Sequence, residues 1–243
     1  MILSGKHSVR EALKSETTID KICVVKGNFD RETNEIVALA RAKNIKVMFC
    51  GKEVLDKETA GKHQGVAAYT SEFKYSETED ILKIAENRNE PPFMVILDGV
   101  TDVHNLGSVL RVAECAGVHG VIIGKHRAAG VNDTVVRISA GAAEHVAVAR
   151  VTNINDFIRE LKERNIWVYA AETGGDDIYK SNLNGAIAVV IGGEDTGVKE
   201  LTRKLCDGVI SLPIKGKVNS LNASVAAGAV LYEIVRQRQY KIV

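Results

Sequence analysis

The stretch FMVILDGVTDVHNLGSVLR, residues 93–111, decides how the larger part of this chain folds. It begins with a short, nearly all-apolar run, and similar runs follow along the chain: GVIIG, VAVARV, IWVYAA, AIAVVIG and VISLP. Unbroken apolar runs of this length are typical of parallel strands that are covered on both faces. Helical patterns lie between them, including LGSVLRVAECAG, NINDFIRELKERN and KELTRKLC, so residues 92–243 are predicted to form an α/β domain with a parallel sheet.

Residues 1–73 follow a different pattern and predict a second, smaller α/β domain. Helical and strand patterns alternate there, in the order SVREAL, IDKICVV, ETNEIVALARAKN, IKVMFC and GVAAYT. The segment that follows, residues 74–91, is rich in charge and runs into the double proline Pro91–Pro92, which disfavours a continuing helix. We therefore predict a linker over residues 74–91.

The composition excludes several classes of protein. The chain has 243 residues, 45% of them hydrophobic and 26% charged, with a net charge of +1, so bulk charge does not indicate a nucleic-acid partner. No apolar stretch approaches the ~20 residues of a membrane-spanning helix, and the first residues lack the apolar core of a signal peptide, so we expect a cytoplasmic protein with no membrane partner. The four cysteines are far apart and form no CxxC pair; we expect buried free thiols, with neither a metal site nor a disulfide framework.

Three of the apolar runs are followed by unusual segments. GVTDVHNLGSVLR follows the run at 93–98, GGEDTG follows AIAVVI, and IKGKVNSLNAS follows VISLP. Ligands of open parallel sheets bind beyond the carboxyl ends of the strands, so these segments are candidates for a site. They lack the GxGxxG and GxxxxGK[ST] signatures, which makes a dinucleotide-binding dehydrogenase or an NTPase a poor candidate, and the glycines alone equally suit a strand-to-helix turn.

Asn105 and Arg111 lie around the start of a helix that we expect to begin near Leu106. A helix cap and a surface arginine would explain them in isolation. However, Arg111 is the only charge among residues 106–113 and has apolar neighbours, which favours an anionic partner such as a phosphate.

The stretch KGKVNSLNASVAAGAVLYEI, residues 215–234, predicts a helix whose first turns carry almost nothing larger than alanine. Ser220 and Asn222 offer a hydroxyl and an amide at its start. The small residues that follow permit close approach by a ligand or by another segment of the chain, and tight helix packing would use them in the same way.

Together, DGVTDVHNLGSVLRVAECAG, IGGEDTGV and LPIKGKVNSLNASVAAGAVLYE closely resemble the three motifs of the SpoU/TrmH family of RNA ribose 2′-O-methyltransferases, in the SPOUT superfamily. The segments SGKHSVREAL and HQGVAAYT resemble the amino-terminal substrate-binding domain of the subgroup that methylates a guanosine of large-subunit ribosomal RNA. The resemblance implies an RNA-binding domain over residues 1–73 and a SPOUT domain with a carboxyl-terminal trefoil knot. It also implies a homodimer through the carboxyl-terminal domain.

The resemblance further implies methyl transfer from S-adenosylmethionine to a ribose 2′-hydroxyl of 23S ribosomal RNA, with no metal. The backbone at Gly192, Leu212 and Leu221 would hold the cofactor, and Thr173, Gly174 and Gly193 would line its site. The implied catalytic residues are Arg111, Asn105, Glu194, Ser220 and Asn222. Because a guanidinium seldom gives up its proton, we expect Arg111 to anchor phosphate and stabilise the developing alkoxide rather than act as the base.

Two other functions stay open at this point. A transfer-RNA ribose methyltransferase would share the chemistry and differ only in the RNA that the first domain admits. A non-catalytic RNA-binding protein is a weaker alternative, because the chain retains all five implied catalytic residues.

Overall fold

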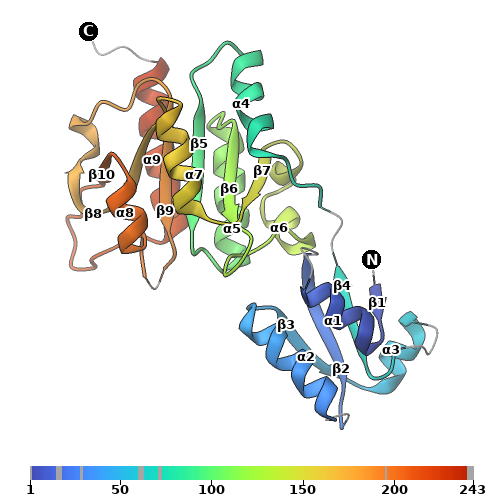
Figure 1. The fold of residues 1–243 in the computed structure, drawn as a ribbon. Helices are drawn as coiled ribbons and strands as arrows, with labels where there is room; N and C mark the ends of the chain where they lie inside the picture. Colours follow the sequence, from blue (N-terminus) through green and yellow to red (C-terminus); the bar gives the residue numbers. More distant parts are fainter. Residues whose placement is uncertain are drawn as a thin grey trace. The chain divides into compact units, whose positions relative to one another are not determined.

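The computed structural model describes residues 2–14, 18–27, 30–59, 63–70, 73–194 and 196–239. The chain divides into two compact units, one of Met1–Lys74 with Gly130–Asp133 and one of Tyr75–Ala129 with Thr134–Val243. Each unit has its own sheet (Figure 1).

The sheet of the first unit has four strands in the order β1-β4-β2-β3. Strands β2 and β3 are parallel, while β4 is antiparallel to both of its neighbours. The bounds are β1 Ile2–Ser4, β2 Ile19–Val25, β3 Lys46–Cys50 and β4 Val66–Thr70, with helices α1 Lys6–Lys14, α2 Arg31–Ala42 and α3 Lys52–Thr59.

Helices cover both faces of this small sheet. Ile22 and Val24 of β2 pack in one cluster with residues of α1 and α2, including Leu13 and Ile36. Cys23, between them in the sequence, points to the opposite face, where it packs with Leu55 of α3. The period of two along β2 therefore separates the two halves of the core.

The sheet of the second unit has six strands, all parallel, in the order β10-β8-β9-β5-β6-β7. The strands are β5 Phe93–Asp98, β6 Gly120–Gly124, β7 Ala147–Val151, β8 Trp167–Asp177, β9 Ile187–Gly192 and β10 Gly208–Ser211. The α-helices are α4 Thr78–Asn87, α5 Val103–Cys115, α6 Asp133–Ile138, α7 Ile154–Glu163, α8 Glu200–Leu205 and α9 Ala223–Gln239, and two short 3-10 helices span Ala142–Glu144 and Ile178–Lys180.

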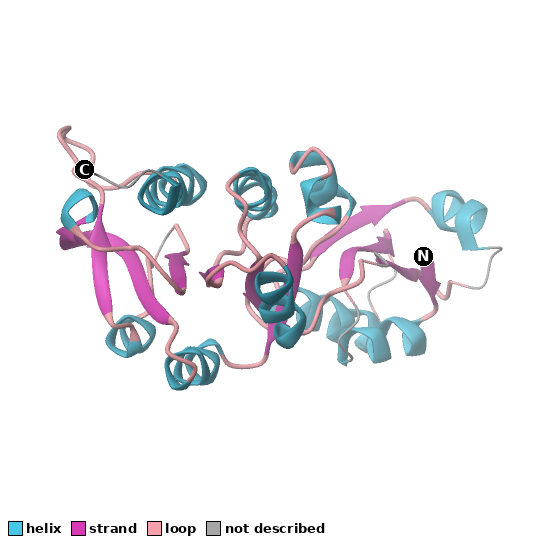
Figure 2. Ribbon diagram, turned by 90° about the horizontal axis from the view of Figure 1, so that it is seen from above, coloured by secondary structure: helices cyan, strands magenta, loops and turns pink. Residues whose placement is uncertain are grey.

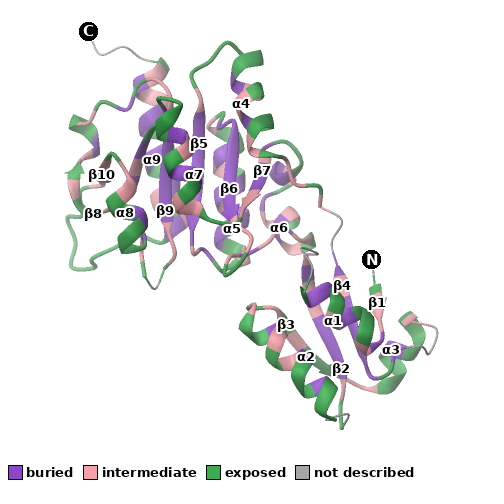
Figure 3. Cartoon of the chain, in the orientation of Figure 1, coloured by how far each residue is buried: buried purple, intermediate pink, exposed green. Residues whose placement is uncertain are grey.

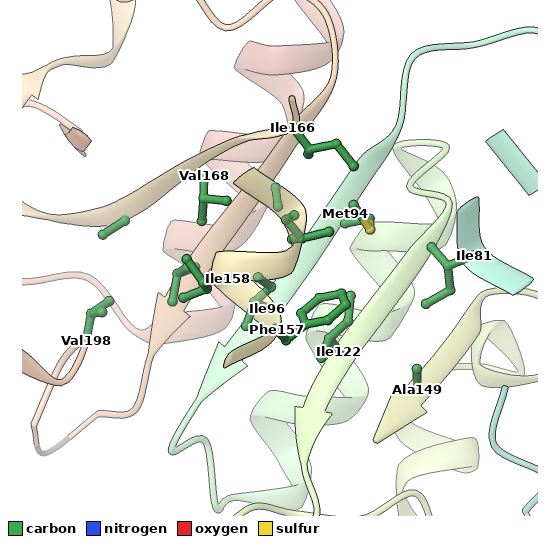
Figure 4. Packing of buried hydrophobic residues seen from close by; sticks show 14 residues of the cluster. Ile81, Met94, Ile96, Ile122, Ala149, Phe157, Ile158, Ile166, Val168 and Val198 are labelled. Atoms are coloured by element: carbon green, nitrogen blue, oxygen red, sulfur yellow. The ribbon is translucent and has the colours of Figure 1, made fainter. Parts of the chain in front are cut away.

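Helices cover both faces of the large sheet as well (Figure 2). On one face, Phe157 and Ile158 of α7 and Ile81 of α4 pack on strand residues such as Met94 and Ile122 (Figure 4). Helices α5 and α9 contact each other on the opposite side of the sheet (Figure 1). The central strands are consequently buried along their length (Figure 3), which explains why their sequences are unbroken apolar runs.

The predicted fold class is confirmed, and the apolar runs mark the strands closely. Strands β5 and β6 begin and end where the runs do. Other elements were not predicted, namely β1, α3, α6 and helix α4. The last of these lies within the predicted linker of residues 74–91, and its Ile81 and Ala85 are buried.

The cysteines differ from the prediction in part. All four are free, but only Cys23 is buried, and Cys115 is exposed on α5. Burial raises the pKa of the Cys206 thiol to about 12. The prediction of four buried thiols is therefore confirmed for Cys23 alone: Cys50 and Cys206 are half-buried, and Cys115 falls on the solvent side of its helix.

No helix among the described residues is long and apolar enough to cross a membrane. The trefoil knot stays a prediction.

Candidate active site

The central pair of strands marks the site. Strands β5 and β9 are neighbours, but the chain leaves them in opposite directions, toward β6 after β5 and toward β10 after β9. Such a switch point in a parallel sheet opens a crevice at the carboxyl ends of the two strands. Two of the three candidate segments begin there.

The loop after β9 is held close to the end of β5. The Gly193 amide donates to the carbonyl oxygen of Asp98 at 3.0 Å, and the Gly197 amide donates to the carbonyl oxygen of Gly193 at 2.9 Å. A Cβ on Gly192 would lie 2.0 Å from the carbonyl carbon of Gly197, and one on Gly193 would lie 2.5 Å from the carbonyl oxygen of Gly99. Residues 192 and 193 therefore have to be glycine in this packing.

A buried carboxylate anchors the far end of the same loop. The side chain of Asp98 is 1% exposed. It accepts a hydrogen bond from the Lys199 amide at 3.1 Å and pairs with the Lys199 ammonium group. The loop that carries Glu194 is thus fixed to β5 at both of its ends.

Three side chains from the three candidate segments meet in one hydrogen-bonded cluster, which we call the Asn–Glu–Asn cluster. Asn105 Nδ2 donates to Glu194 Oε1 at 2.6 Å. Asn222 Nδ2 donates to the same oxygen at 2.8 Å and to Asn105 Oδ1 at 3.0 Å. Two amide groups therefore orient a single carboxylate at the mouth of the crevice.

The position of Asn105 corrects the predicted start of helix α5. The helix begins at Val103, and Asp102 caps it by accepting from the His104 amide at 2.9 Å. Asn105 lies in the first turn, where only 5% of the residue is exposed. Since Asp102 satisfies the helix end, the Asn105 side chain is available for the cluster.

Asn222, whose amide was expected at the start of the helix, caps α9. Its Oδ1 accepts from the Ser224 amide at 2.9 Å and from the Ser224 hydroxyl at 2.7 Å, at the start of α9. The same amide group therefore serves the helix with its oxygen and the cluster with its nitrogen.

A pocket of about 200 Å³ opens beside the cluster. Of the residues expected to bind a cofactor, Thr173, Gly192, Gly193, Leu212 and Leu221 line it, and of those expected to be catalytic, Glu194 and Ser220 line it. Gly174 is not among the lining residues; it adopts a φ of +82° in β8, where an added Cβ would meet no atom within 4 Å.

Arg111 stands apart from this arrangement. It is exposed on α5, and its side chain forms no hydrogen bond or ion pair with another residue in the described part of the chain. Its apolar neighbours in the sequence turn toward the protein, with Leu110 fully buried. The guanidinium is thus free to meet a ligand from solution.

Two of the small residues that were expected to permit close approach by a ligand, Ala223 and Ala226, line the pocket at the first turns of α9. The pocket also includes residues that sequence reasoning missed, and of these Ile210 and Ile214 form part of its apolar wall. Glu172 also lines it. A charged residue directly after the apolar run IWVYAA was the available signal for Glu172, but β8 continues past that run to Asp177.

Among the described residues, no group of three or more His, Cys, Asp or Glu side chains is arranged to hold a metal ion.

Known proteins resemble this chain along nearly its full length. The family model described as the SpoU rRNA Methylase family matches residues 92–232, and the model described as RNA 2'-O ribose methyltransferase substrate binding matches residues 2–76. A protein of Bacillus subtilis (strain 168), named as a TrmH family tRNA/rRNA methyltransferase, is 42% identical over 96% of this chain and 94% of its own length. The 23S rRNA (guanosine-2'-O-)-methyltransferase of Pectobacterium atrosepticum is 41% identical over 98% of each chain.

The fold also matches solved structures. The crystal structure of the SpoU methyltransferase AviRb from Streptomyces viridochromogenes, in complex with the cofactor AdoMet, superimposes with a TM-score of 0.61. The match covers 98% of this chain and 90% of that chain at 24% sequence identity, so the two proteins share a fold.

Proposed function

Because the chain belongs to the SpoU rRNA methylase family, we propose that it transfers a methyl group from S-adenosylmethionine to the ribose 2′-hydroxyl of a guanosine in large-subunit ribosomal RNA. The observation that carries the proposal is the Asn–Glu–Asn cluster. Three segments far apart in the sequence meet there in hydrogen bonds, beside a pocket lined by the residues expected to hold the cofactor.

The pocket suits this methyl donor. Its described lining includes the carboxylates of Glu172 and Glu194 and no Lys, Arg or His, which favours a cationic ligand. The apolar side chains of Ile210 and Leu212 provide surface for an aromatic base. In the proposal, backbone groups at Gly192, Leu212 and Leu221 hold the cofactor, and Thr173 and Gly193 line its site.

The residues of the chain position and desolvate the reacting groups. S-adenosylmethionine supplies an activated methyl group on a cationic sulfonium. Asn105 and Asn222 orient the Glu194 carboxylate, and Ser220 lies at the pocket with its hydroxyl available. Arg111 binds the RNA phosphate and stabilises the developing alkoxide, a role that a permanently charged guanidinium can fill. By aligning the two reactants in the crevice, the chain would let the bond between the 2′-oxygen and the methyl carbon form as the methyl–sulfur bond breaks. The sulfonium would leave as a neutral thioether, and the hydroxyl proton would pass to water.

We assign the choice of RNA to residues 1–73 and the chemistry to residues 92–243, with residues 74–91 joining them. The family model for substrate binding, which spans residues 2–76, supports this division. We further propose a homodimer formed through the carboxyl-terminal domain, and a cytoplasmic location because ribosomal RNA is the substrate.

The product of the reaction tests the proposal. Purified protein is incubated with tritiated S-adenosylmethionine and either large-subunit ribosomal RNA or transfer RNA, and the RNA is digested to nucleosides. We expect label in 2′-O-methylguanosine from ribosomal RNA. Label on a base would refute the reaction type.

Transfer RNA is the second candidate substrate, favoured by the name of the Bacillus subtilis relative, which covers both RNA classes. Ribose label confined to transfer RNA would keep the chemistry and overturn the substrate. A protein that binds RNA but shows no calorimetric signal with S-adenosylmethionine would instead be a non-catalytic binder.

A further inference from the structure

Glu172 is a charged side chain in a pocket wall that is otherwise built mainly from backbone and apolar groups. It lies on β8 and lines the pocket together with Thr173 and Ile210. Its side chain is 23% exposed. The mechanism proposed above gives no role to a carboxylate at position 172.

One oxygen of this carboxylate forms no hydrogen bond. Oε2 is buried and forms no hydrogen bond with any described residue. The nearest cation is the Arg203 guanidinium, whose Nη1 is 3.8 Å away, beyond hydrogen-bond distance. Arg203 is itself half exposed, so solvent screens this ion pair and it compensates little of the carboxylate's lost hydration.

The other oxygen restricts how the side chain can move. A Cβ on Gly197 would come within 2.4 Å of Glu172 Oε1, so the carboxylate packs directly against the backbone of the loop after β9. Gly197 also lines the pocket. The loop that carries Glu194 therefore holds Glu172 beside the same space.

A buried carboxylate oxygen without a hydrogen bond, held only in a solvent-screened ion pair with Arg203, is stabilised further by a charged partner in the pocket. The described lining of the pocket contains no cationic side chain that could be this partner. A positively charged group of a ligand in the pocket can therefore pair with the Glu172 carboxylate.

We propose that Glu172 is a specificity-determining residue that pairs with a positively charged group of the methyl donor. This inference rests on the proposed function, because it concerns the same pocket and the same cofactor. S-adenosylmethionine carries two such groups, the sulfonium and the α-ammonium. The product S-adenosylhomocysteine keeps only the ammonium, and 5′-methylthioadenosine has neither.

The test is isothermal titration calorimetry of the full-length wild-type protein and Glu172→Gln with these three ligands. Glutamine keeps the shape and removes the charge, so the melting temperature without ligand should stay at the wild-type value. Glu160→Gln is the matched control, since Glu160 pairs with Arg164 on α7 and does not line the pocket. We expect Glu172→Gln to raise the dissociation constant for S-adenosylmethionine about tenfold, which corresponds to the loss of one charge-assisted hydrogen bond.

The pattern over the three ligands identifies the group. If Glu172→Gln lowers the affinity for S-adenosylmethionine alone, Glu172 pairs with the sulfonium. If it lowers the affinities for S-adenosylmethionine and S-adenosylhomocysteine equally, Glu172 pairs with the ammonium. Unchanged affinities, or equal loss for all three ligands, would overturn the role of Glu172. A wild-type protein that binds none of them would instead refute the proposed cofactor, which separates the two failures.

Discussion

Asn222 performs two tasks with one side-chain amide. Its oxygen faces the first amide groups of α9, and its nitrogen faces Glu194 and Asn105. Only this orientation of the amide satisfies both sides, because the helix end offers donors and the Glu194 carboxylate offers acceptors. The start of α9 and the candidate active site are therefore coupled through a single residue.

Two substitutions separate these tasks. Asn222→Ala should lower the stability of the protein by about 1 kcal/mol through loss of the cap, and it should also reduce methyl transfer severely. Asn222→Ser keeps a side-chain oxygen that can cap α9, so the melting temperature of this variant should stay near that of the wild type. Its rate of methyl transfer should still fall, because the amide nitrogen that donates to Glu194 is gone. Full activity in Asn222→Ser would reduce Asn222 to a helix cap.

Arg111→Ala should abolish methyl transfer and leave both the melting temperature and the affinity for S-adenosylmethionine unchanged. The reason is that Arg111 is exposed and has no ionic partner in the described structure, so its removal breaks no contact within the protein. Arg159→Ala is the control, an equally drastic change at an exposed arginine on α7 whose one ion pair among the described residues is with Asp156. Turnover of Arg111→Ala at the wild-type rate would remove this residue from the proposed mechanism.

At the scale of elements, the first turns of α9 carry small side chains because they lie next to both the pocket and helix α5. Ala223 and Ala226 form part of the pocket wall. On another side of the helix, a Cβ on Gly228 would lie 3.6 Å from Val112 Cγ2, which is van der Waals contact with α5. Small residues therefore allow one helix to approach both the ligand space and another helix.

Ala226→Leu tests this explanation. Added bulk in a dense contact costs about 1–3 kcal/mol, so the variant should melt at a lower temperature and bind S-adenosylmethionine more weakly. Ala229→Leu adds the same atoms at an exposed position of the same helix and should match the wild type in both measurements. If the two variants behave alike, the face of α9 that carries Ala226 is open and its small residues need another explanation.

At the scale of the whole molecule, the described residues of the pocket and of the Asn–Glu–Asn cluster all belong to the second unit. Deleting residues 1–73 should therefore leave a dimer that binds S-adenosylmethionine, while selective methylation of ribosomal RNA fails. Sedimentation and calorimetry measure the first two properties, and tritium transfer to ribosomal and transfer RNA measures the third. Loss of cofactor binding in a folded, dimeric truncation would contradict the division of labour that we propose.

The elements were predictable where one local cause decides the structure. The run at Phe93–Asp98 is apolar because helices cover both faces of β5. Helix α4 was missed because most of its surface is charged and exposed, and only Ile81 and Ala85, four positions apart, reveal its buried side.

The amino-acid sequence by itself determined the types of most elements and the loops that carry the chemistry, since each depends on neighbouring residues. Only the tertiary structure decided that Asp102 rather than Asn105 caps α5, and that Asn105 bonds to Glu194 and Asn222, 89 and 117 positions away. It likewise placed Glu172 against Gly197. These contacts depend on β5 and β9 being neighbours in the sheet, and strand order is set by packing of the whole domain, which no local pattern encodes.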